Sequence, residues 1–148
     1  MITAALLPAL DEWSAPFWEG CSGGELRVQR CGGCGAFRMP PRPMCPRCRS
    51  LDARWEPVSG RGRIWSFVVP HPPLLPAFND LAPYNVIVVA IDEDPTIRFV
   101  GNLVASADGA VNEVDPAGIE IDVPVRVVFS SPVSDEAGAV SFPRWVLA

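Results

Sequence analysis

Two Cys-x-x-Cys pairs constrain the fold of this chain more than any other feature of its sequence. The first pair is Cys31 and Cys34, and ten residues separate it from the second, Cys45 and Cys48. Each short turn presents two sulfur ligands, so the pairs together complete a tetrahedral site with metal–sulfur bonds of about 2.3 Å. Because thiolates fill all four positions, none is left for water or substrate. The pattern predicts a structural zinc ion, with iron in a rubredoxin-like site or a redox dithiol as alternatives.

The rest of the chain favours a metal site over disulfides. Its start, MITAALLPALDEW, lacks the basic residues and cleavage site of a secretory signal. No apolar run reaches the roughly 18 to 20 residues that span a bilayer. These features predict a cytoplasmic protein, and the cytoplasm disfavours disulfides. The fifth cysteine, Cys21, is expected to pack as a small apolar side chain.

Positive charge is concentrated around the cysteines. The net charge is −5, yet residues 27–63 contain nine arginines and two acids. Four thiolates on a divalent cation leave a net charge of −2, which nearby guanidiniums would offset. Alternatively, some of these arginines bind the phosphates of coenzyme A, because the guanidinium fork matches phosphate oxygens. The candidates for this second role are Arg42, Arg47, Arg49, Arg61 and Arg63.

Short strands and turns dominate the expected fold. The seventeen prolines and twelve glycines favour them over long helices. Alternating segments at 26–30 and 54–58 flank the cysteine pairs. Five further apolar runs follow Gly62, and they suit a small closed barrel of the OB type, which leaves no exposed sheet edge. The runs cover residues 62–69, 84–92, 96–104, 123–129 and 139–147.

Two apolar segments are candidates for a partner interface. Apolar residues recur at helical spacing in residues 6–18, and the prolines at 8 and 16 predict two short helices that begin near them. Residues 70–83 contain too many prolines for a central strand, so this apolar loop either closes one end of the barrel or meets a partner. The proposed interface residues are Trp13, Phe17, Trp18, His71, Leu74, Leu75 and Phe78.

The expected fold class is mainly β, with short N-terminal helices, a rubredoxin-like zinc ribbon and a C-terminal OB-fold barrel. The boundaries place the helical segment at 1–24, the ribbon at 25–58 and the barrel at 59–148. Catalytic proton transfer commonly uses histidine, and the chain has only His71. No phosphate-binding loop or dinucleotide motif is present. The sequence therefore predicts no catalytic residues and no independent enzyme.

A single-stranded nucleic-acid-binding module is an alternative function, because zinc ribbons and OB folds both serve it. The arginine-rich stretch would follow the phosphates, and Trp65, Phe67 and Phe99 would stack on bases. The negative net charge and the absence of lysine count against this hypothesis. The three aromatic residues also alternate as core residues would.

The order of these features resembles a known family. A segment ending PFWEG precedes GELRVQRCGGCGAFRMPPRPMCPRC, and EPVSGRGRIWSFVV, PYNVIVVAID, VPVRVVF and FPRWVL follow. Over nearly the whole chain this pattern is similar to the zinc-ribbon/OB-fold family catalogued as domain of unknown function 35. The metal ligands of the family correspond to the four paired cysteines, and no catalytic residues carry over. The connection at 105–121 is longer than is usual in the family.

The resemblance implies an accessory subunit of acyl-CoA metabolism. Members accompany thiolase-superfamily proteins, which include lipid-transfer-type aldolases that cleave steroid side chains and acetyl-CoA acetyltransferases, and they also accompany MaoC-type hydratases. In the aldolase pair, the thiolase-like subunit carries the retro-aldol residues, and the ribbon/OB subunit stabilises it beside the acyl-CoA. We therefore expect a hetero-oligomer with a thiolase-like aldolase that acts on a steroid side-chain CoA thioester. Acetyltransferase/thiolase or MaoC-type hydratase partners are the alternatives.

Overall fold

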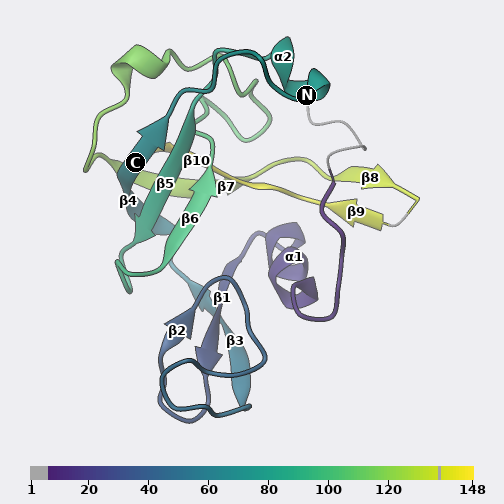
Figure 1. Cartoon of the computed structure of the whole chain (residues 1–148), viewed down its shortest axis with the longest axis vertical. Helices are drawn as coiled ribbons and strands as arrows, with labels where there is room; N and C mark the ends of the chain where they lie inside the picture. Colours follow the sequence, from purple (N-terminus) through teal and green to yellow (C-terminus); the bar gives the residue numbers. More distant parts are fainter. Residues whose placement is uncertain (1–6, 137) are drawn as a thin grey trace.

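The computed structural model describes residues 7–136 and 138–148 and forms two lobes (Figure 1). A small three-stranded sheet makes up one lobe and a five-stranded sheet the other. With its short helices, the chain is mainly β, which confirms the expected fold class. None of the helices within the described residues has the length and apolar character needed to cross a membrane.

The smaller sheet has the order β2-β1-β3 and is antiparallel throughout. β1 (Leu26–Cys31) pairs over its full length with β3 (Ala53–Val58), and β2 (Phe37–Arg38) pairs with the other edge of β1. The first cysteine pair lies at the end of β1 and in the turn to β2, and the second lies in residues 39–52 between β2 and β3. The sheet thus brings both pairs to one end of the lobe.

The larger sheet is a closed barrel with the order β10-β7-β4-β5-β6. Its closure follows β6, where the chain runs parallel to β10: Trp145 N donates to Asn102 O at 3.1 Å and Val104 N donates to Trp145 O at 2.8 Å. This closure pairs backbone groups that an open sheet edge would leave free. Its strands are β4 (Arg61–Val68), β5 (Val86–Ile91), β6 (Arg98–Gly101), β7 (Pro124–Phe129) and β10 (Pro143–Leu147).

One apolar core joins the barrel to the base of the smaller lobe. Alternate residues of β5 point inward, and Trp145 fills the barrel at 1% exposure. The same cluster includes Leu26 of β1 and Phe17 of α1 (Ala15–Ser22). The Phe17 ring stacks on Phe99 of β6 with centroids 6.1 Å apart. The two lobes therefore share buried surface at their junction.

The N-terminal prediction is correct for one helix only. α1 begins with Pro16 in its first turn, as the sequence predicts. The helix expected near Pro8 is absent from residues 7–14, where the chain is extended and then turns. In that turn the Asp11 carboxylate accepts hydrogen bonds from Ser14 N at 2.7 Å and Ser14 Oγ at 2.8 Å. A local side-chain acceptor of this kind competes with helical hydrogen bonds. Residues 1–6 lie outside the described part.

Three connections carry short elements of their own. The proline-rich loop contains α2 (Pro76–Asn79), and the connection from β6 to β7 contains a 3-10 helix, η2 (Pro116–Gly118). β8 (Val133–Asp135) and β9 (Gly138–Val140) form a hairpin beside the barrel (Figure 1). The run predicted as one strand at 139–147 is thus two, because β9 pairs with β8 whereas β10 pairs with β7.

Candidate metal centre

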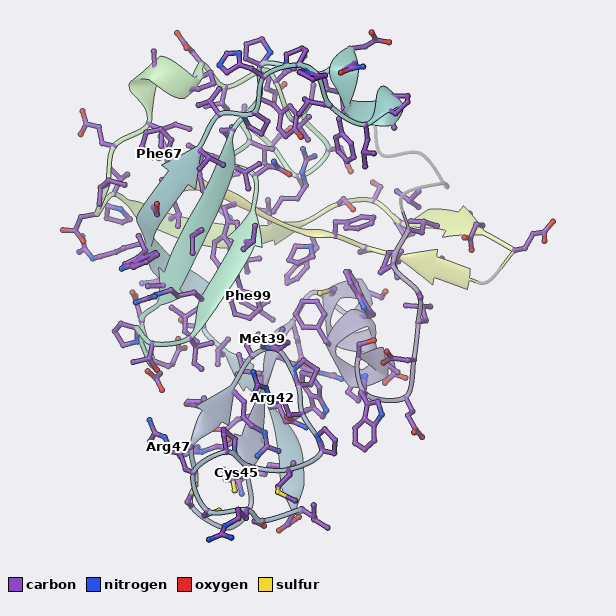
Figure 2. All side chains as sticks on the ribbon, viewed as in Figure 1. Met39, Arg42, Cys45, Arg47, Phe67 and Phe99 are labelled. Atoms are coloured by element: carbon purple, nitrogen blue, oxygen red, sulfur yellow. The ribbon has the colours of Figure 1, made fainter. Side chains whose placement is uncertain are left out.

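The four paired cysteines converge at the far end of the smaller lobe, where Figure 2 labels Cys45. All four sulfur atoms lie within 4.8 Å of one another. The Sγ atoms of Cys31 and Cys48 are 3.5 Å apart, and those of Cys34 and Cys45 are 3.7 Å apart. A tetrahedral ion with 2.3 Å bonds places its sulfur ligands about 3.8 Å apart. The arrangement therefore fits a single metal ion.

Two matching turns present the sulfurs. Gly35 N donates to Cys31 O at 3.0 Å, and Arg49 N donates to Cys45 O at 2.9 Å. Both turns end in a left-handed residue, with φ of 72° at Gly35 and 63° at Arg49. Glycine adopts this conformation without steric cost, whereas the Cβ of an arginine makes it unfavourable. The two halves of the site thus have the same backbone path with different strain.

The electrostatics of the cluster favour a bound cation. The hydrogen bond from Cys34 N, 3.4 Å from Cys31 Sγ, is the main cause that lowers the pKa of Cys31. The backbone N–H of Cys48 likewise lowers the pKa of Cys45 to about 6. The Ser50 N–H lowers the pKa of Cys48, but the hydrogen-bonded Cys31 sulfur and burial outweigh it and raise that pKa to about 11. Since neighbouring thiolates resist a further negative charge, a cation is what permits all four to ionise.

Arg30 ties the first cysteine turn to β3. Its Nε donates to Gly35 O at 2.9 Å, and its Nη1 donates to both carboxylate oxygens of Glu56 at 2.8 and 2.9 Å. The guanidinium also lies 4.9 Å from the centroid of the Phe37 ring. The hydrogen bond from Arg30 is the main cause that lowers the pKa of Glu56. This arginine is thus occupied by structural contacts.

A buried polar pair holds the segment that leads to the second cysteine turn. Gln29 Oε1 accepts from Arg38 Nε at 2.7 Å and from Arg42 N at 2.8 Å. Gln29 and Arg38 are each 5% exposed, and Arg38 Nη1 and Nη2 have no acceptor among the described residues. No local sequence pattern indicates this pair, because the contact depends on the pairing of β1 with β2.

The arginines predicted to bind coenzyme A form two separate groups. Arg42, Arg47 and Arg49 are exposed in residues 39–52 of the smaller lobe, where Figure 2 labels the first two. Arg61 and Arg63 are exposed on β4 of the barrel. Within the described residues, no contact joins the two groups. The structure therefore does not gather the five into a single site.

The aromatic residues near the N-terminus differ in exposure. Trp13 is 48% exposed, whereas Phe17 is 7% exposed and belongs to the core of the chain. Trp18 is half-buried, with its ring centroid 5.0 Å from that of Phe17 and 5.7 Å from that of Phe142. Trp13 and the open part of Trp18 thus remain on the surface, and Phe17 does not.

The proline-rich loop keeps part of its apolar surface exposed. His71 is exposed, and Leu75 is 69% exposed. Leu74 and Phe78 are half-buried, and the Phe78 ring centroid lies 6.0 Å from that of Tyr84. The loop therefore packs partly on the barrel and partly faces outward.

Only one of the three expected stacking platforms faces solvent. Trp65 is 51% exposed, whereas Phe99 is 7% exposed and Phe67 packs against the core. Trp65 continues the outward row of Arg61 and Arg63 on β4. The β4–β5 register then shifts between Ile64 and Ser66, which turns Phe67 to the inner side, where it pairs with the buried Ile87. Sequence alternation misses such a bulge. A nucleic-acid site built on all three aromatics is therefore not formed.

Comparison with known proteins identifies both lobes. Residues 18–52 match the family described as the ChsH2 rubredoxin-like zinc ribbon domain, and residues 55–130 match the ChsH2 C-terminal OB-fold domain. A chain of the solved Ltp2-ChsH2(DUF35) aldolase is similar at a TM-score of 0.76 and 32% identity, over 95% of this chain and 98% of that one.

Two hydratase alpha subunits are among the relatives of this chain. The probable enoyl-CoA hydratase alpha subunit of Thermomonospora curvata is 38% identical over 80% of this chain. The 3-oxo-4,17-pregnadiene-20-carboxyl-CoA hydratase alpha subunit of Mycobacterium tuberculosis is 31% identical over 97%. This chain spans only 33% and 39% of the lengths of these two proteins.

The third relative is of similar size to this chain. A DUF35 domain-containing scaffold protein of Methanothermobacter thermautotrophicus is 33% identical over 79% of this chain and 81% of its own length. The two domain matches and this relative confirm the family resemblance seen in the sequence. The chain belongs to the ChsH2 family of zinc-ribbon and OB-fold proteins, the DUF35 proteins.

Proposed function

We propose that this chain is a noncatalytic accessory subunit of an acyl-CoA enzyme complex. Its partner is a thiolase-like aldolase that performs retro-aldol cleavage of a steroid side-chain CoA thioester. The observation that carries the proposal is the similarity, over 95% of the chain, to a chain of the Ltp2-ChsH2(DUF35) aldolase. His71 is exposed in the proline-rich loop, far in sequence from the cysteine cluster.

Co-expression tests the subunit role. The chain is produced with and without a thiolase-like protein of the Ltp2 type from the same genome. We expect one peak containing both proteins in gel filtration, and an aldolase activity that depends on both. Separate elution, together with a partner equally soluble and active alone, excludes the role.

A hydratase complex is the second candidate, and the two hydratase alpha subunits among the relatives favour it. Because this chain spans about two fifths or less of those proteins, it would supply only the ribbon and barrel of such a complex. Co-purification with a MaoC-type protein instead of the aldolase, with hydration of an enoyl-CoA, would select this candidate.

We further infer that the cysteine cluster holds a structural Zn²⁺. The sulfur spacing of 3.5 and 3.7 Å supports one tetrahedral ion, and four sulfur ligands leave no position for substrate. Elemental analysis of the purified chain is expected to give one zinc per chain. Equimolar iron with visible absorbance would show that the ion is iron and not zinc, and a metal-free folded chain would exclude the site.

The proposal also assigns surface residues to the partner interface and to coenzyme A. The partner interface combines Trp13 and Trp18 with the loop residues His71, Leu74, Leu75 and Phe78. Phe17 is omitted because the chain itself buries it. Coenzyme A phosphates would meet exposed arginines, either the group at Arg42, Arg47 and Arg49 or the group at Arg61 and Arg63.

A further inference from the structure

The outer face of the barrel sheet carries four arginines from three strands. Arg61 of β4 lies directly opposite Arg126 of β7 in the strand register, and both are exposed. One row further, Arg63 of β4 and Arg98 of β6 both pair with Ala90 of β5. Since paired residues point to the same side of a sheet, the four guanidiniums share one face. This concentration stands out in a chain of net charge −5.

Two of these arginines lack a counter-charge. Like charges directly opposite each other destabilise an antiparallel pair. Neither the Arg61 nor the Arg126 guanidinium has a hydrogen-bond or ion-pair partner among the described residues. Together with Arg63 they line a cavity of about 340 Å³. Asp92 also lines this cavity, so three arginines and one carboxylate surround a space that an anion of phosphate size fits.

A second cavity, of about 430 Å³, adjoins the first, since Arg63 and Asp92 line both. Trp65 forms part of its wall at 51% exposure, on the same face of β4 as Arg61 and Arg63. The Arg98 guanidinium lies over one face of the Trp65 ring, 3.6 Å from its centroid. A nucleobase would therefore stack on this guanidinium–indole pair, since both groups are planar surfaces that bases stack on.

We propose that this face binds a nucleotide that carries at least two phosphate charges. The phosphates bind Arg61 and Arg126 in the first cavity, and the base stacks in the second against the pair of Trp65 and Arg98. Asp92, between the two, accepts a hydrogen bond from a ribose hydroxyl. An acidic peptide fits less well, because its carboxylates offer no planar ring to stack on Trp65 and Arg98.

This inference deepens the coenzyme A part of the proposed function. It selects the barrel group of arginines over the group in the smaller lobe, and it adds Arg126, Trp65 and Asp92. That the natural ligand is coenzyme A rests on the proposed function. The binding itself is a property of this chain alone.

The test is calorimetric titration of the isolated, metal-loaded chain with adenosine 3′,5′-bisphosphate at low salt. The wild type is expected to bind, and Arg61→Gln and Arg126→Gln to weaken binding about tenfold each, as loss of a charged hydrogen bond does. Trp65→Leu is expected to weaken nucleotide binding about tenfold and to leave tripolyphosphate binding unchanged. The matched control is Arg47→Gln, an exposed arginine of the other lobe, which should bind like the wild type.

Thermal melting controls for folding. Both arginine variants should melt at or above the wild-type temperature, because each removes one of two opposed positive charges. Absence of heat with wild type at millimolar nucleotide overturns the proposal. So does equal loss in the Arg47 control, or nucleotide affinity that Trp65→Leu leaves unchanged, which means an adventitious ion only.

Two outcomes separate this inference from the subunit role. If Arg61→Gln and Arg126→Gln disrupt a complex with the thiolase-like protein while nucleotide binding is unchanged, the face meets an acidic protein and the proposal is overturned. If the chain forms that complex but binds no nucleotide, the subunit role stands and this inference falls. If the chain binds nucleotide but forms no complex, this inference stands and the subunit role falls.

Discussion

The barrel and the cysteine-bearing end of the ribbon hold short strands together in different ways. The barrel closes on itself around aliphatic side chains such as Ile87, Val89 and Ile91, each 0% exposed. At the far end of the ribbon, the buried side chains are Cys31 and Cys45, above the polar pair of Gln29 and Arg38. A unit with so little apolar core depends on a metal to fold. The barrel thus distributes its stability over many contacts, whereas the ribbon end concentrates it at one point.

Removing a metal ligand is the largest change that tests this comparison. Cys45→Ser is expected to lose the metal and unfold the cysteine turns, since the binding energy of a structural zinc, on the order of 10 kcal/mol, is folding energy in small zinc domains. Metal content and amide hydrogen exchange measure the effect. We expect exchange protection to fall at the cysteine turns and to persist in β5.

The fifth cysteine supplies the matched control. Cys21 is 1% exposed in the core, and burial raises its pKa to about 12. Cys21→Ala should therefore keep the metal and lose only packing. If Cys45→Ser instead removes protection from β5 as completely as from the cysteine turns, the shared core at Leu26 and Phe17 makes the lobes one cooperative unit, and the comparison fails.

The second-largest effect is expected in the barrel. Trp145→Ala should cost about 3 to 5 kcal/mol of unfolding free energy, because it empties the centre of a closed core. The Trp145 ring faces Phe99 at 6.4 Å and lies close to Gly101, where an added Cβ would be 3.0 Å from its Cδ1. Urea denaturation measures the loss, and metal content should be unchanged if the ribbon end is held by its ion.

A surface tryptophan gives the control for this substitution. Trp65→Ala removes a side chain that is 51% exposed, so it should cost less than about 1 kcal/mol. Equal losses from the two variants would show that the barrel interior is not where the stability of this lobe resides.

The parts that sequence predicts well are those with local chemical or periodic patterns. The cysteine cluster follows from two short motifs with one plausible chemistry. The five barrel strands follow from apolar runs between turn residues. The extended strand predicted at 139–147 fails because its two halves pair with different partners, a fact that no local pattern contains.

The parts that sequence does not predict depend on register. Arg61 and Arg126 are 65 residues apart in the sequence and lie opposite one another only because β4 pairs with β7. Trp65 and Phe67 have the same place in the sequence alternation, yet a bulge after Ile64 leaves Trp65 facing outward and turns Phe67 inward. Phe17, proposed as an interface residue from its helical spacing, is instead buried against Phe99. In each case a nonlocal pairing decides exposure.

The third prediction concerns the buried polar pair of the ribbon, where one substitution is expected to stabilise the chain. Arg38→Met is expected to stabilise the chain by about 1 to 2 kcal/mol, because two nitrogens of a 5% exposed guanidinium have no acceptor among the described residues. Gln29 keeps its bond to Arg42 N in this variant. The matched change Gln29→Leu should destabilise by about 1 to 3 kcal/mol, since it leaves that N–H unpaired. Thermal unfolding with metal bound separates the two, and destabilisation by Arg38→Met would mean that ordered water or an ion satisfies the guanidinium.

The smallest expected effect compares the two cysteine turns with each other. Arg49 adopts φ of 63°, at a cost of about 1 to 2 kcal/mol for a residue with a side chain, whereas Gly35 adopts 72° at the matching position without that cost. Arg49→Gly should therefore stabilise the metal-bound chain by about 0.5 kcal/mol, after the greater backbone entropy lost by glycine is subtracted. Gly35→Ala should destabilise it by about 1 kcal/mol through the same strain. Competition with a chelator measures both, because strain in either turn appears as weaker metal retention. Identical retention in the two variants would show that the ion, and not the turn conformation, fixes the geometry of the ribbon end.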